Sequence, residues 1–77
     1  MDSEKFHALL KAIECGSLTG AAEELGYTQA GLTHMMNRLE KEIGVSLLQR
    51  TKLGVKLSPD GQELLPYIKN FTDAASA

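Results

Sequence analysis

The stretch that decides the fold runs from residue 16 to residue 44 and reads GSLTGAAEELGYTQAGLTHMMNRLEKEIG. Its first part predicts a short helix, because the hydroxyls of Ser17 and Thr19 can cap a helix start. Gly26 then supplies a tight turn. The side chains of Ala21 and Ala22 are small, so that a second helix can cross this one closely. The pattern therefore predicts two helices joined by a turn, the arrangement of a helix-turn-helix.

A second helix is predicted after that turn, with Thr28 as its N-cap, an end near Ile43 and Gly44 as a left-handed terminator. At about 100° per residue, its apolar side chains fall within a stripe about 60° wide and its polar ones within a separate arc of about 140°. The apolar stripe consists of Leu32, Met36, Leu39 and Ile43. The polar arc consists of Gln29, Thr33, His34, Asn37 and Lys41. One face is therefore expected to pack, and the other to display groups that can hydrogen-bond base edges.

Upstream of this stretch, Ser3 can cap another helix that ends near Gly16. Its apolar residues recur at helical spacing. They are Phe6, Leu9, Leu10 and Ile13. A three-helix core is therefore expected.

Downstream of Gly44 the apolar pattern changes to a period of two, which predicts a small β-hairpin. We expect its first strand to contain Val45, Leu47, Leu48 and Arg50, its turn to span residues 51–54 and its second strand to span residues 55–57. A two-stranded ribbon is barely stable alone, so it should lie against the helices. Its basic tip would then be free to reach phosphate or a minor groove.

A last helix is predicted from Ser58, with Ser58 as cap, Pro59 in the first turn and Asp60 near the positive end of the helix dipole. Its apolar residues are Leu64, Leu65, Ile68 and Phe71. They spread more widely around the helix than one small core needs, which favours a dimer surface over purely intradomain packing.

Charge is unevenly distributed along the 77 residues, whose net charge is −2. Residues 27–56 carry five basic side chains against two acidic ones, whereas acidic side chains outnumber basic ones on both sides of this segment. A phosphate backbone responds to the field within a Debye length of about 8 Å, so the local excess matters more than the total. Two acids of the segment have other expected roles: Glu42 in an ion pair with Arg38, and Glu40 in a hydrogen bond or ion pair within the domain, with Arg50 as a candidate partner.

Several classes of function are disfavoured by the residue inventory. Cys15 has no second cysteine, and with His7 and His34 it cannot build a tetrahedral metal site, so packing is its expected role and no cofactor is expected. No segment is long and apolar enough to cross a membrane, and the N-terminus lacks the basic-then-apolar pattern of a signal peptide, so we expect a cytoplasmic protein. No catalytic triad, carboxylate pair or phosphate loop occurs at a meaningful spacing, so we expect a protein that is not an enzyme.

The sequence resembles the N-terminal domain of LysR-type transcription regulators over nearly its whole length. The resemblance depends on many spaced positions and is far more specific than a bare helix-turn-helix pattern. The positions are Gly16-Ser17-Leu18-Thr19-Gly20-Ala21-Ala22, Leu25, Thr28-Gln29, Thr33, Leu39-Glu40, Ile43-Gly44, Leu47-Leu48, Arg50, Leu57-Ser58 and Gly61. It implies a winged helix-turn-helix over residues 1–57 and a linker helix over residues 58–77 that pairs two subunits, ahead of an effector-sensing domain absent from this chain.

The resemblance also implies a surface that binds double-stranded DNA. The protein would be a bacterial, nucleoid-associated transcription regulator that binds a dyad-symmetric operator as a homodimer. The major groove would be faced by Gln29, Ala30, Thr33 and His34. The basic wing, which is the predicted hairpin, would lie near the sugar-phosphate backbone of the DNA. The full set of expected DNA-binding residues is Thr28, Gln29, Ala30, Thr33, His34, Asn37, Arg50, Lys52 and Lys56. Leu53 stands where members of that family often carry an arginine, so the resemblance does not extend to minor-groove insertion by the wing tip.

One alternative function remains open at this point. A winged helix can serve only for protein interaction or dimerisation, with the wing and the last helix as the contact surface. The acidic total and Leu53 at the wing tip favour this alternative. Retardation of mixed DNA duplexes at low salt would distinguish the two functions.

Overall fold

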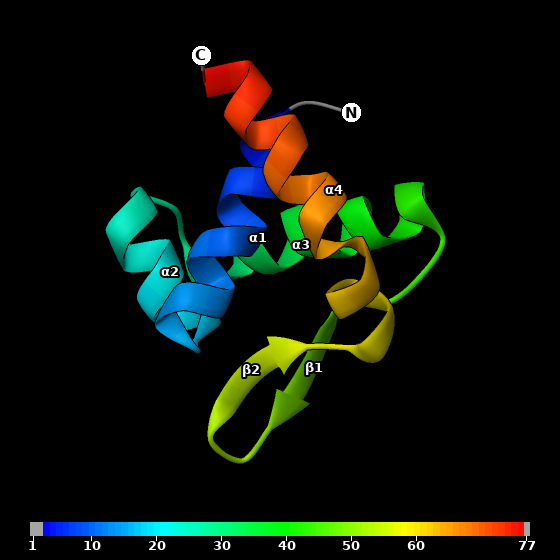
Figure 1. Cartoon of the computed structure of the whole chain (residues 1–77). Coiled ribbons are helices and arrows are strands. Elements are labelled where there is room, and N and C mark those ends of the chain that lie inside the picture. Colours follow the sequence, from blue (N-terminus) through cyan, green and yellow to red (C-terminus); the bar gives the residue numbers. More distant parts are fainter. Residues whose placement is uncertain (1–2, 77) are drawn as a thin grey trace.

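The computed structural model describes residues 3–76, with side chains described up to residue 70. It contains four helices and one two-stranded antiparallel sheet. In chain order these are α1 (Ser3–Cys15), α2 (Leu18–Leu25), α3 (Gln29–Ile43), β1 (Leu48–Thr51), β2 (Gly54–Leu57) and α4 (Pro59–Ser76). The hairpin extends from one end of the helical body, and α4 runs from the base of the hairpin along α1 (Figure 1). The expected class, mainly helical with one β-hairpin, is confirmed.

Local capping sets the limits of α2 and α3. The Ser17 hydroxyl accepts a hydrogen bond from the Gly20 N–H at 3.1 Å, and the Thr28 hydroxyl accepts one from the Gly31 N–H at 3.0 Å. Both helices end at glycines in the left-handed region, Gly26 at φ 79° and Gly44 at φ 93°, where a side chain would strain the backbone. The predicted caps of both helices are therefore confirmed.

The core lies where α1, α2 and α3 cross. The predicted stripe of α3 points into it: Leu32, Met36 and Leu39 are buried, and Ile43 packs against them at the edge. On α2, Ala21 and Ala22 are also buried. Small side chains at a helix crossing let the two backbones approach closely. The expected close packing of the helix-turn-helix is thus confirmed.

The hairpin begins later than the sequence pattern predicted. Its register pairs Leu48 with Leu57 and Thr51 with Gly54, so that the turn consists of Lys52 and Leu53 alone. Val45 and Leu47, which were expected in the first strand, lie before it. The backbone of Leu47 is bonded to the helices instead: its N–H donates to a carboxylate of α3, and its carbonyl accepts from the residue before α4. These bonds take the place of ladder bonds, so the prediction was wrong at this point.

The start of α4 follows the expected pattern. Ser58 precedes Pro59, and its hydroxyl accepts a hydrogen bond from the Gly61 N–H at 2.9 Å. Ser58 is buried. The α4 helix packs on α1 and on β2, and Ile68 reaches the core. The hairpin is therefore followed at once by a helix that rests on the same core.

Candidate nucleic-acid interface

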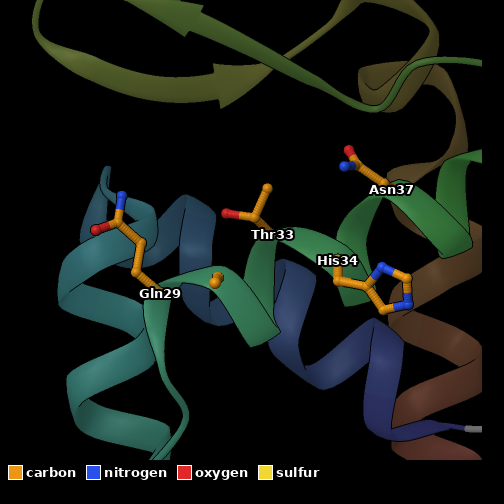
Figure 2. Close-up of a pocket in the computed structure, with 5 residues that line it drawn as sticks. Gln29, Thr33, His34 and Asn37 are labelled. Atoms are coloured by element: carbon orange, nitrogen blue, oxygen red, sulfur yellow. The ribbon is translucent and has the colours of Figure 1, made fainter.

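The polar arc of α3 forms an exposed surface. A shallow groove along the helix is lined by Gln29, Ala30, Thr33, His34 and Asn37. Figure 2 shows Gln29, Thr33 and Asn37 pointing to the side where the hairpin lies, with His34 directed away from them. All are exposed except Thr33, which is half-buried. The structure therefore brings together five of the nine residues predicted to bind DNA.

The groups on this surface have unused hydrogen-bonding capacity. Within the part of the chain whose side chains are described, no hydrogen bond or ion pair involves the side chain of Gln29, Thr33, His34 or Asn37. The opposite face of the helix is fixed by its buried leucines. Amides, a hydroxyl and an imidazole are thus presented on a rigid support, as recognition of base edges requires. Thr28, the predicted DNA-binding residue at the helix start, is exposed but uses its hydroxyl for the cap.

The three basic residues of the hairpin are all exposed, but they do not share one face. Arg50 pairs with Val55, and together they line a small hollow against α3 that Asn37 also lines. Lys56 pairs with Gln49, and neighbouring positions of a strand point to opposite faces. Lys52 lies in the turn. Arg50 therefore lies beside the polar surface of α3, and Lys56 projects from the other face of the hairpin.

A further cation on α3 was missed by the sequence reasoning. Glu42 does not pair with Arg38 as predicted: it binds Lys5 of α1, with Nζ and Oε1 at 2.6 Å. The hydrogen bond from Lys5 lowers the pKa of the Glu42 carboxyl. Arg38 consequently has no ion pair among the described residues, and with His34 it lines a second groove on the helix. The ion pair between Lys5 and Glu42 joins residues 37 positions apart, so no local signal in the sequence could have revealed it.

The other acid of this segment, Glu40, makes hydrogen bonds within the domain as expected, but to different partners. Its Oε2 accepts from the N–H groups of Leu47 at 2.5 Å and Leu48 at 3.0 Å. No ion pair between Glu40 and Arg50 occurs among the residues with described side chains. The suggested Arg50 partner was therefore wrong, and the carboxylate is bound by backbone amides.

Cys15 is the half-buried last residue of α1 and faces Glu24 of α2. Its thiol donates to Glu24 Oε2 at 3.4 Å, and Lys11 Nζ lies 3.4 Å from the same oxygen. Burial, followed by the bond to Glu24, raises the pKa of the Cys15 thiol, so the nucleophilic thiolate is disfavoured at neutral pH.

Over the described residues no group of three potential metal ligands comes together, and none of the helices is long and apolar enough to span a bilayer.

The apolar residues predicted to form a dimer surface on α4 do not all lie at the surface. Ile68 is buried in the chain's own core, and Leu64 packs against that core. Leu65 is half-buried, and the Phe71 side chain lies outside the described residues. Tyr67, which was not singled out from the sequence, is 72% exposed. Among the α4 side chains that are described, up to residue 70, Leu65 and Tyr67 therefore leave apolar surface exposed.

Comparison with known proteins agrees with this architecture. The family described as bacterial regulatory helix-turn-helix protein, lysR family, matches residues 3–62. The HTH-type transcriptional regulator CzcR of Bacillus subtilis strain 168 is 44% identical over 55 residues, which are 71% of this chain and 19% of CzcR. The HTH-type transcriptional regulator TdcA of Escherichia coli K12 is 40% identical over 62 residues, 80% of this chain and 20% of TdcA.

A solved structure extends the likeness to three dimensions. The crystal structure of the CbnR_DBD–DNA complex superposes with a TM-score of 0.89 at 28% identity, over 99% of this chain and 87% of that chain. The present chain spans about one fifth of the length of CzcR and TdcA. With the family model covering most of its residues, the chain belongs to the LysR family of bacterial regulatory helix-turn-helix proteins.

Proposed function

We propose that this chain binds double-stranded DNA with sequence preference, with α3 in the major groove, as the DNA-binding part of a bacterial transcription regulator in the cytoplasm. The observation that carries this proposal is the division of α3 into a buried face and a face of unbonded polar side chains. The major groove admits one α-helix, and base edges there present distinct donor and acceptor patterns. The structural likeness to a domain solved in complex with DNA supports the same function.

The proposed contacts fall into two groups. Gln29, Thr33 and Asn37 would read base edges, with Ala30 and His34 beside them, because they occupy the groove of α3. Thr28, Arg50, Lys52 and Lys56 would bind the sugar-phosphate backbone. Phosphate contacts set affinity and register, and base contacts set selectivity. Since Arg50 faces α3 and Lys56 does not, we expect Arg50 to contribute more affinity than Lys56.

The general test is fluorescence anisotropy of mixed-sequence duplexes, repeated over a range of salt concentrations. The logarithm of the binding constant should fall linearly with the logarithm of salt, with a slope of about −0.9 for each phosphate that a cation neutralises. Absence of binding at low salt would instead support the alternative, a winged helix that serves only for protein interaction.

Gln29→Ala is expected to weaken discrimination between DNA sequences more than it weakens binding to random DNA. A bidentate amide contact to a base is worth about 1–3 kcal/mol of discrimination, so preference for the best site should fall by about 5- to 150-fold. The measurement is the ratio of affinities for a selected site and a scrambled duplex. Gln62→Ala removes the same amide from an exposed position on α4 and serves as the control. Equal losses on both duplexes would refute the role of Gln29.

We further propose that residues 58–77 act as a linker helix through which two copies pair, and that two α3 helices then address half-sites of a dyad-symmetric operator. Leu65 and Tyr67 support this proposal because they leave apolar surface on α4 uncovered within one chain. Half-sites should be separated by one helical turn, about 10–10.5 bp, or a multiple of it.

Sedimentation equilibrium of the 77-residue chain tests the pairing. We expect a concentration-dependent dimer that Leu65→Gln weakens. Gln62→Ala should leave the dimer unchanged, because Gln62 is exposed and its replacement removes no apolar side chain. A chain that stays monomeric with and without a palindromic duplex would contradict the role of α4.

A further inference from the structure

We infer that Glu40 is a positioning residue that sets the place of the hairpin relative to α3, and through it the place of the hairpin's cations on DNA. The latter part rests on the proposed function. The Glu40 carboxylate belongs to α3, and its Oε2 accepts from two successive backbone amides, Leu47 N–H at 2.5 Å and Leu48 N–H at 3.0 Å. Leu48 is the first residue of β1. A side chain of the helix with the polar surface is therefore bonded directly to the start of the hairpin.

The hairpin needs such an external support. It has two strands of four residues each, and a two-stranded ribbon is marginally stable by itself in water. Residues 45–47, which join α3 to β1, are neither helix nor strand. Hydrogen bonds to an ionised carboxylate are shorter and stronger than those between neutral groups. Glu40 is therefore well suited to fix the direction in which the chain leaves α3.

A second set of bonds holds the same segment from the side of α4. The Ser58 hydroxyl donates to the Ser46 carbonyl at 2.5 Å, and the Ser58 N–H donates to the Leu47 carbonyl at 2.9 Å. At Gly61, an added Cβ would come within 2.7 Å of the Leu47 carbonyl oxygen, which shows how closely α4 approaches. Residues 46–48 are thus held between Glu40 on one side and the start of α4 on the other.

The position of Glu40 links the two groups of residues proposed to bind DNA. Glu40 lines the hollow between α3 and the hairpin together with Asn37 of the polar surface and Arg50 of the hairpin. If the hairpin turned about its base, Arg50 and Lys52 would move relative to Asn37. The bonds of Glu40 therefore determine whether both groups can meet one duplex at the same time.

A charge effect alone would act in the opposite direction. Glu40 is an acid on the helix that faces DNA, so removing its charge should raise affinity for a polyanion. The positioning role predicts a loss of affinity when the acceptor oxygen is removed. Two variants separate these effects, because Glu40→Gln and Glu40→Ala have the same net charge but only Gln retains an oxygen that can accept hydrogen bonds.

The test measures affinity for a selected duplex with Glu40→Gln, Glu40→Ala and the control Glu42→Ala, an acid of the same helix that binds Lys5 instead of the hairpin. We expect Glu40→Ala to bind about tenfold more weakly than Glu40→Gln, which corresponds to about 1.4 kcal/mol, the loss of one or two hydrogen bonds to a neutral acceptor. Glu42→Ala should bind as tightly as the parent or more tightly. Equal affinities for the two Glu40 variants would overturn the inference.

A second background shows whether the effect passes through the hairpin. In a chain carrying Arg50→Gln, Lys52→Gln and Lys56→Gln, the hairpin no longer attracts phosphate, and the difference between the two Glu40 variants should shrink to less than about twofold. A merely structural role would leave the tenfold difference unchanged and would overturn the inference.

Amide hydrogen exchange without DNA gives a readout that does not depend on the proposed function. In Glu40→Ala, which has lost the acceptor oxygen, the amides of Leu47, Leu48 and the hairpin should exchange at least about tenfold faster than in the parent, while those in the middle of α3 keep their rates. Unchanged exchange at Leu47 and Leu48 would overturn the positioning role. If the parent bound no DNA, the proposed function would fail, and this experiment would still decide the role of Glu40.

Discussion

Replacing Gly54 with alanine is expected to release the hairpin from the helical body. Gly54 has φ 133°, which side chains rarely adopt, and an added Cβ would lie 1.9 Å from the Gly16 carbonyl oxygen. That oxygen accepts the Val55 N–H at 3.0 Å, so the clash falls on the bond that joins the hairpin to the turn between α1 and α2. Backbone strain of this kind amounts to about 1–3 kcal/mol, and the lost bond adds about 1 kcal/mol.

Urea denaturation of Gly54→Ala measures the effect. Gly20→Ala is the matched control, because a Cβ there meets nothing closer than 3.7 Å and alanine in a helix is about 1 kcal/mol better than glycine. We expect the first variant to lose about 2 kcal/mol or more of unfolding free energy and the second to gain. The DNA affinity of Gly54→Ala should also fall, towards the affinity of the variant that carries Arg50→Gln, Lys52→Gln and Lys56→Gln. A Gly54→Ala protein as stable as the parent would contradict the close contact with Gly16.

Leu32→Ala is expected to have the largest effect on stability. Leu32 is fully buried on the packed face of α3, between the exposed Gly31 and the half-buried Thr33. Truncating a buried leucine removes about 2–5 kcal/mol, depending on how far the site can collapse. At about 0.05–0.15 kcal/mol per residue, a domain of this size has only about 4–12 kcal/mol of stability. Loss of Leu32 should therefore leave a large unfolded fraction and abolish presentation of the polar surface.

The thermal unfolding midpoint checks this prediction, with Leu53→Ala as the control. Leu53 is 98% exposed in the hairpin turn, so the same truncation should change stability by no more than about 0.5 kcal/mol. A similar shift in both variants would mean that α3 does not pack through its leucine face.

The parts of the fold that could be predicted from sequence are those set by local chemistry. Ser17 and Thr28 cap helices through their own hydroxyls, and Gly44 ends α3 because it adopts φ 93°. Each of these signals acts over about four residues, so it can be read directly from the chain. The helical periodicity of α3 likewise identified both its buried stripe and the polar groove at Gln29 and Thr33.

The errors concern features set by contacts between distant residues. Leu47 was assigned to a strand by its apolar spacing, but Glu40 and Ser58 bind its backbone and delay the start of β1. Glu42 was paired with Arg38 by helical spacing, but Lys5 of another helix lies closer. In both cases the competing partner became available only when the helices packed.

The differences at the candidate site likewise come from contacts between distant residues. The hairpin cations were treated as one group, whereas the register places Arg50 and Lys56 on opposite faces. Arg38 was assigned to an ion pair and so was left out of the binding surface. Ile68 was counted towards a dimer surface, although α4 turns it into the core of its own chain. The register of the hairpin and the rotation of α4 about its axis are set by tertiary packing, so they could not be read from the sequence alone.

The most direct test of the account maps the DNA contact onto the protein by NMR. The duplex is first selected from a random library and then titrated into isotope-labelled protein at low salt. We expect the largest chemical-shift changes at Gln29, Thr33 and Asn37, including the side-chain amides of Gln29 and Asn37, with a second group at Arg50 and Lys52. Changes concentrated on α1 or α4, with the groove of α3 unaffected, would contradict the central claim that the polar face of α3 contacts the bases.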